Sequence, residues 1–174
     1  MAPPVSPPGT TAAGDDATTR EASESRVCDL LTESQVGAVA GFPVTAQKQA
    51  GIDPGLDPSV APSPGCSWND SESPYSPAHI SVVHGDKRYF DHAMDFLRTG
   101  GPGISFTVTK RMVHGVDERK VVPHQGPQDG HVIDIFMLRG DSSFELSLAL
   151  RDGASDADRV AAFGAMEKLL LPRI

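Results

Sequence analysis

Long apolar runs and an excess of basic residues are both missing from this sequence. No window approaches the 18 or so consecutive apolar residues of a membrane-spanning helix, and no charged-then-apolar leader precedes the first proline. Lysine and arginine number 15 against 23 aspartates and glutamates, for a formal net charge of −8 at pH 7. A nucleic-acid-binding surface needs a basic stripe that displaces counterions from phosphates. We therefore expect a water-soluble chain that binds no nucleic acid.

Motifs of known catalytic chemistry are missing as well. Serines follow glycine in GCSW and GISF, but neither segment forms the G-x-S-x-G turn of a hydrolase. The glycine-rich TGGPGIS lacks the lysine and the spacing of a phosphate-binding loop. Among the six histidines, His79 and His84 are five apart on a predicted strand and so point to opposite faces. The sequence therefore predicts no catalytic residue, no metal site and no cofactor.

Only two cysteines occur, Cys28 and Cys66, and they stand far apart in the chain. Their spacing matches neither a C-x-x-C redox site nor a four-ligand zinc pattern. A disulfide between them would link the first predicted helix to the first predicted strand and would stabilise the fold by roughly 4 kcal/mol. This interpretation implies an oxidising compartment. The alternative is two free buried thiols in a cytosolic protein.

The segment of residues 1–25 is composed of proline, alanine, serine, threonine and acidic residues with a single valine. Such a composition buries too little surface to offset the entropy of ordering. We expect a disordered tether over residues 1–25 and one domain over residues 26–174. A tether of this kind is what remains when a signal peptide or lipobox is cut away and a start methionine is added. A cytosolic protein with a disordered tail is the alternative.

Three segments have the periodicity of amphipathic helices. The first begins with a capping box, in which Thr32 precedes Gln35 by three residues, and it ends at Gly41. The second has its apolar positions at Tyr89, Phe90, Ala93, Met94 and Leu97. The third is capped by Ser155 with Asp158 and stops at Pro172; its apolar positions are Val160, Phe163, Met166, Leu169 and Leu170.

Alternating or extended segments predict strands around these helices. They comprise an extended segment that begins at Cys66, strands over residues 79–84 and 104–110, and a β-hairpin that turns at Gly140 and Asp141. The segments from Phe42 to Gly65 and from Arg111 to Gly130 have no clear period, and we expect them to form long loops at a variable rim.

This order of elements predicts an α+β domain with an antiparallel sheet. Helices are expected to cover one apolar face of the sheet, and the opposite face is rich in serine and threonine. An α/β sandwich similar in shape to the Mog1 and PsbP folds is consistent with this order, as an analogy of element order alone.

Trp68 is the single tryptophan and stands two positions after Cys66. Two residues at this spacing on a strand point to the same face. The first interpretation is that the indole packs beside the disulfide, and the second is that it forms a stacking platform for a ligand.

Three further candidate ligand-contacting residues lie on predicted loops, where functional groups tend to gather. They are His114, Asp117 and His124. Together with Glu118 they could form an acid–base cluster. The plainer interpretation is that these loops carry charged residues for solubility.

Three segments together resemble a family of small actinobacterial lipoproteins, domain of unknown function 3558. They are CDLLTESQVGAVAG, CSW and the closing MEKLLLPRI, and the likeness runs from about Cys28 to Ile174. A glycine-x-aspartate turn of the family is echoed by Gly115, Val116 and Asp117. Members carry a lipid-attachment cysteine ahead of a tether, whereas this chain has the tether without a lipobox. The resemblance implies a cell-surface or secreted protein, and it implies no activity.

Two functions are consistent with these observations. The first is a non-enzymatic, extracytoplasmic binding domain for a protein or small molecule, held near the membrane only through an N-terminal lipid anchor that has been removed. The second is a small cofactor-independent enzyme, either an acid–base catalyst or a cyclase, with a pocket between sheet and helices. An apolar pocket with a titratable group of perturbed pKa favours the enzyme, and a filled core with a flat rim favours the binding domain.

Overall fold

The computed structural model of the chain describes residues 26–52, 63–73, 75–99, 105–124 and 133–174. The tether predicted over residues 1–25 lies outside these ranges. The helices are α2 (Glu33–Ala40), α3 (Lys87–Thr99) and α4 (Asp156–Leu170), and a short 3-10 turn, η1 (Leu171–Arg173), follows α4. The strands are β1 (Val44–Ile52), β2 (Ser63–Asp70), β3 (His79–Asp86), β4 (Ser105–Val113), β5 (Val116–His124), β6 (Ile133–Arg139) and β7 (Ser142–Ala149).

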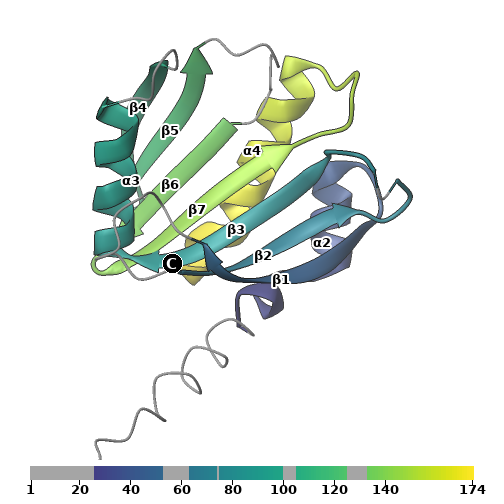
Figure 1. Cartoon of the computed structure of the whole chain (residues 1–174), viewed down its shortest axis with the longest axis horizontal. Coiled ribbons are helices and arrows are strands. Elements are labelled where there is room, and N and C mark those ends of the chain that lie inside the picture. Colours follow the sequence, from purple (N-terminus) through teal and green to yellow (C-terminus); the bar gives the residue numbers. More distant parts are fainter. Residues whose placement is uncertain (1–25, 53–62, 74, 100–104, 125–132) are drawn as a thin grey trace, which may run out of the picture.

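The strands form one 7-stranded sheet in the order β1-β2-β3-β7-β6-β5-β4 (Figure 1). All neighbouring strands are antiparallel. The central pairing joins β3 to β7, with Ile80 opposite Leu148 and Val82 opposite Leu146. This pairing unites the first three strands with the last four. The predicted α+β class with an antiparallel sheet is confirmed.

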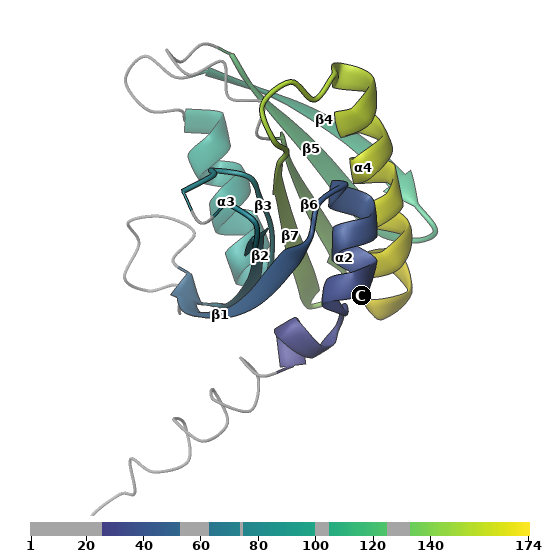
Figure 2. The same cartoon turned by 90° about the vertical axis from the view of Figure 1, so that its right-hand side faces the viewer.

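The helices divide between the two faces of the sheet. Figure 2 shows the sheet close to edge-on, with α2 and α4 on one side and α3 on the other. We call these sides the α4 face and the α3 face. Helices were expected on one face only, but Val83, Val121 and Phe136 give the α3 face an apolar patch of its own. Tyr89, Phe90 and Ala93 of α3 pack against that patch.

The larger core lies on the α4 face. Its largest fully buried side chains are Trp68, Ile80, Met137, Phe144, Leu146, Leu148, Met166 and Leu170. A disulfide joins Cys28, just before α2, to Cys66 on β2 across a sequence separation of 38. The predicted disulfide is therefore confirmed, and it fastens the helical layer to the sheet next to the core.

Both predicted helix caps are confirmed. The Thr32 side chain accepts a hydrogen bond from the Gln35 backbone, and the Gln35 side chain accepts one from the Thr32 backbone, so that two N–H groups of the first turn are satisfied. Ser155 and Asp158 form the same reciprocal pair at the start of α4. Helix α2 ends at Gly41, whose φ of 78° is the left-handed conformation that glycine adopts without a steric penalty.

Strand β1 lies inside the segment that was expected to be a loop from Phe42 to Gly65. It is an edge strand, and only Val44 and Ala46 are packed against the larger core. Its other described side chains are polar. An edge strand pairs with one neighbouring strand and has one covered face, so it needs few apolar residues. The hydrophobic pattern of β1 was therefore too weak to predict a strand from the sequence.

Strand β5 occupies much of the second expected loop, from Arg111 to Gly130. Strand β4 continues to Val113, and a two-residue turn of His114 and Gly115 leads into β5. Both turn residues have positive φ, 49° and 81°, as a type I′ hairpin requires. The rest of the expected loop, beyond residue 124, lies outside the described residues.

Cross-strand ion pairs explain why a run of four charged residues folds as a strand. On the α3 face Lys110 of β4 pairs with Asp117 across the strands at 3.3 Å, and Arg119 of β5 itself pairs with the same carboxylate, with Nε to Oδ1 at 2.7 Å. On the α4 face Glu118 pairs with Arg111 of β4. Opposite charges on facing strands stabilise a sheet, so the charges that suggested a loop contribute to the β4–β5 pairing.

Candidate functional site

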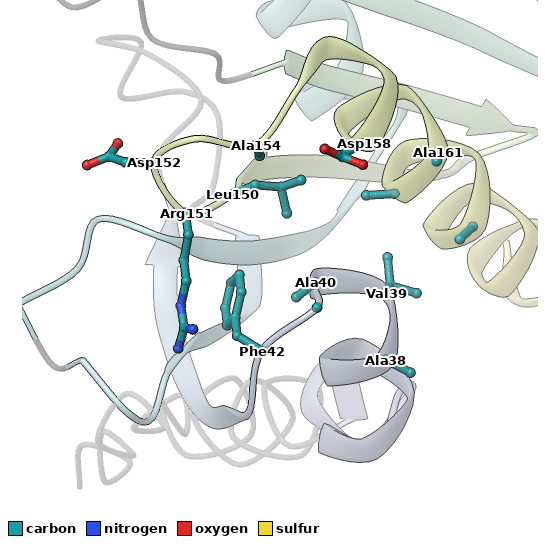
Figure 3. A pocket seen from close by; sticks show the side chains of 13 residues that line it. Ala38, Val39, Ala40, Phe42, Leu150, Arg151, Asp152, Ala154, Asp158 and Ala161 are labelled. Carbon is teal, nitrogen blue, oxygen red and sulfur yellow. The ribbon is translucent and has the colours of Figure 1, made fainter.

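Helix α4 borders two hollows on the α4 face, one along each of its long sides. The first, the α2–α4 groove, has a volume of about 600 Å³ and lies between the end of α2, the connection after β7 and the start of α4 (Figure 3). Its lining residues are Ala38, Val39, Ala40, Gly41, Phe42, Leu150, Arg151, Asp152, Ala154, Asp158, Ala161, Ala162 and Ala165. Six of these 13 lining residues are alanine, so much of the lining consists of small apolar side chains.

Two charged groups of the α2–α4 groove are already engaged within the fold. The Arg151 guanidinium lies 4.9 Å from the centre of the Phe42 ring, beside which Figure 3 shows it. It also donates to both carboxylate oxygens of Asp70, at 2.6 and 2.7 Å, and this pairing holds the pKa of Asp70 below its usual value. Asp158 serves as the cap of α4 with Ser155. Arg151 and Asp158 therefore already serve to stabilise the fold.

The second hollow, the α4–β5 groove, lies on the other side of α4 and has a volume of about 460 Å³. Its lining residues are Thr109, Arg111, Glu118, Lys120, Ile135, Val160, Phe163, Gly164, Glu167 and Lys168. Apolar and charged side chains therefore face the same space. This mixture is typical of sites that bind and orient a small molecule.

An ion network around one buried carboxylate, that of Glu118, lies in the α4–β5 groove. Glu118 is only 2% exposed, and Arg111 donates to it through Nε and through Nη2, the latter at 3.2 Å. Arg111 also donates to Glu167 of α4. Burial and the neighbouring Glu118 raise the pKa of Glu167, although Arg111 opposes the shift. The network links α4 to β4 and β5 and places charged groups along the groove.

Gly164 stands in the interior of α4 and lines the α4–β5 groove. A Cβ added at this position would meet no atom within 4 Å, so close packing does not require glycine here. Glycine inside a helix costs about 0.5–1 kcal/mol relative to alanine. The chain thus keeps a destabilising residue at the point where a side chain would project into the hollow.

Val160 lines the same groove one turn before Gly164. It was expected to be buried with the other apolar positions of α4, but it is 58% exposed. The hydrophobic pattern was misleading here because this flank of α4 borders the hollow. An exposed apolar side chain at the rim leaves contact area for an apolar ligand.

The α3 face carries a row of polar side chains across five strands. In the order of the strands from β1, the row comprises Gln47, Ser67, Ser81, Ser147 and Asp134, each opposite the next. Ser147 Oγ donates to Asp134 Oδ1 at 2.6 Å. Burial raises the pKa of Asp134 above its ordinary value. This row agrees with the expectation of a serine-rich second face.

Glu145 lies beside this row on β7, where Tyr89 of α3 donates a hydrogen bond to it. Burial raises the pKa of Glu145 to about 7, and the nearby Asp134 adds to the shift. A carboxyl group of this kind holds or releases a proton near neutral pH, which is the property that a general acid or base needs.

The structure does not gather the three candidate residues predicted from the loops. His114 is exposed at the β4–β5 turn, and Asp117 lies at the same end of β5, where Arg119 lowers its pKa. His124 is the last residue of β5 and lies at the opposite end of the strand, about 26 Å from Val116 at about 3.3 Å per residue. Asp117 and Glu118 point to opposite faces, so the residues of the expected acid–base cluster are separated.

Trp68 lies in the larger core, with its side chain 0% exposed. Ala46 of β1 and Ile80 of β3 are its direct strand neighbours. Its Nε1 atom has no hydrogen-bond partner among the described residues. The placement agrees with an indole that packs beside the disulfide and leaves no ring face to stack on a ligand.

Sequence reasoning missed the residues that define these sites. Gly164 interrupts an amphipathic helix without ending it, and that interruption is a signal that could have been followed. Lys120 and Lys168 stand at ordinary solvent positions in the sequence, and Glu145 alternates with leucine as any outward-facing strand residue would. The surroundings of these residues are created by the packing of α3 and α4 on the sheet, so they are not visible in the sequence.

Comparisons with known proteins give no independent assignment. The chain matches no protein-family model, and no curated protein is similar to it. Within the described ranges, no three histidine, cysteine or acidic side chains lie close enough together to hold a metal ion. The helices of those ranges are all too short or too polar to cross a membrane.

Proposed function

We propose that this chain is a non-enzymatic binding domain that works outside the cytoplasm and holds a small molecule in the α4–β5 groove. The observation that carries the proposal is Gly164, which keeps the groove open at a cost to helix stability and without a packing reason. The volume of about 460 Å³ falls within the range of about 300–1,000 Å³ typical of ligand sites.

An extracytoplasmic location is supported by the Cys28–Cys66 disulfide. Disulfides persist in oxidising compartments and are rare in the cytosol. The proline- and serine-rich composition of residues 1–25 and the resemblance to a lipoprotein family support the same location. In this proposal the tether places the binding domain at a distance from the cell surface.

A second candidate function is acid–base catalysis on the α3 face, favoured by the pKa of about 7 at Glu145. The Tyr89–Glu145 hydrogen bond also has a structural use, because it links α3 to β7. We therefore place this function second. Recovery of a bound compound unchanged after long incubation supports the binding domain, and a conversion that Glu145→Gln abolishes supports the enzyme.

The groove is tested with an uncharged fluorescent probe, N-phenyl-1-naphthylamine, whose emission rises in apolar surroundings. Gly164→Leu places a side chain in the hollow, so the dissociation constant of the probe should rise at least tenfold. Ala161→Leu is the matched control, since it adds a similar side chain on the opposite flank of α4, in the α2–α4 groove.

Folding of each variant is checked by thermal and urea denaturation. Gly164→Ala should raise the free energy of unfolding by about 0.5–1 kcal/mol, which shows that the position tolerates a side chain. If Gly164→Leu binds the probe as well as the parent, or if Ala161→Leu is the variant that loses binding, the α4–β5 groove is not the site.

A further inference from the structure

The charges around the α4–β5 groove are unequal. Arg111, Lys120 and Lys168 face the groove together with two carboxylates, Glu118 and Glu167. Both carboxylates are already bound by Arg111. Neither lysine forms an ion pair within the part of the chain that the structure describes. The groove therefore has a local excess of positive charge, although the formal net charge of the protein is −8.

The lining of the groove changes in character along α4. Val160, Gly164 and Lys168 are spaced by four residues, so they follow one another along the same side of the helix. This side of α4 thus presents an apolar side chain at Val160, no side chain at Gly164 and a cationic side chain at Lys168. Phe163 and Ile135 add apolar lining, and Lys120 of β5 adds the second cation.

We propose that the α4–β5 groove binds an amphiphilic anion, a small molecule with an apolar body and a single acidic head group. The body lies against Val160 and Phe163, and the carboxylate, sulfonate or phosphate of the head lies between Lys120 and Lys168. This inference rests on the proposed function and names the chemical class of its ligand. A point charge on a flexible stem, as lysine provides, suits any of these head groups.

Two probes that differ by one sulfonate group test the head group. The dye 8-anilino-1-naphthalenesulfonate carries a sulfonate on the same ring system as the uncharged N-phenyl-1-naphthylamine. The parent protein should bind the sulfonate at least tenfold more tightly, and the preference should shrink as salt screens the charges. In Lys120→Met/Lys168→Met the dissociation constant of the sulfonate should rise at least tenfold, while that of the uncharged dye stays within twofold.

Lys87→Met is the control for the loss of a lysine charge, because it makes the same substitution on α3, on the opposite face of the sheet (Figure 2). It should leave the affinities for both dyes unchanged. A sulfonate preference that is absent from the parent, or that survives in the double variant, overturns the inference but leaves the groove intact as a site for uncharged ligands. If the parent binds neither dye, the proposed function itself fails.

Competition against the bound sulfonate dye distinguishes the possible sources of the head group. Decanoate, decyl phosphate and decanol share a ten-carbon body and differ in the head. Tighter competition by decanoate indicates a fatty carboxylate, and tighter competition by decyl phosphate indicates a phosphorylated lipid or metabolite. Competition by uncharged decanol equal to that of both acids contradicts the inference.

Discussion

The phenolic hydroxyl of Tyr89 donates a hydrogen bond to the carboxyl group of Glu145 across the contact between α3 and β7. This carboxyl is largely removed from water, and burial raises its pKa from an ordinary value of 4.5 to about 7. Val83 and Phe136 lie directly opposite Glu145 on the two neighbouring strands. An acidic group therefore stands among apolar residues at the point where the helix is attached.

The raised pKa of Glu145 predicts that folding stability falls as the pH rises from about 4.5 to above 7. In this window the unfolded chain releases the proton of Glu145 while the folded chain keeps it, so the folded state binds more protons. The contribution is fully present below pH 4.5 and is lost as the pH passes 7. A loss of about 1–3 kcal/mol is expected over the window.

Urea denaturation of Glu145→Gln between pH 5 and pH 8 measures this contribution. The variant carries an amide that does not titrate, so its free energy of unfolding should change less with pH than that of the parent. Asp141→Asn, in the exposed β6–β7 turn, removes the same charge and should keep the slope of the parent. An unchanged slope in Glu145→Gln would show that this carboxyl ionises alike in both states.

The disulfide between Cys28 and Cys66 predicts a large loss of stability when both residues become serine. Linking residues separated by 38 positions restricts the unfolded chain, and the chain-entropy treatment gives roughly 4 kcal/mol for a loop of this size. The free energy of unfolding of the double variant should fall by about that amount. Denaturation of the parent with and without reductant provides the control, and equal midpoints would contradict the prediction.

Features that depend on neighbouring residues in the sequence were predictable. The cap residues Thr32 and Ser155 act on N–H groups three positions away, so their helices begin where the sequence indicates. The Gly140–Asp141 hairpin is equally local, and Gly140 has the positive φ of 63° that such a turn uses. The alternation of Phe144, Leu146 and Leu148 with polar residues is also readable in the sequence, and in β7 all three side chains are buried on one face.

Features that depend on partners far along the chain were not predictable in the same way. Strand β1 has few apolar residues and gains its stability from pairing with β2. Strand β5 is rich in charge, and its two acidic residues are paired by β4: Arg111 pairs with Glu118, which lies directly opposite, and Lys110 pairs with Asp117. The α4–β5 groove brings together residues from β4, β5, β6 and α4, so no short segment of sequence contains its pattern.

The burial of Trp68 predicts a large loss of stability when its indole ring is removed. Its side chain is 0% exposed and packs in the larger core, so Trp68→Ala should lower the free energy of unfolding by about 3–5 kcal/mol. Trp68→Phe should cost less, because Nε1 has no hydrogen-bond partner among the described residues and mainly volume is lost. Urea denaturation measures both effects.

Probe binding separates this structural role from a stacking role for Trp68. The indole lies outside the lining of the α4–β5 groove, so Trp68→Phe should bind N-phenyl-1-naphthylamine as the parent does at temperatures where both are folded. If Trp68 were a stacking platform, the result would be the opposite. Trp68→Ala would no longer bind the probe but would keep the melting temperature of the parent. That result would require the indole to leave the core, and it would overturn the role in packing that its burial beside Cys66 indicates.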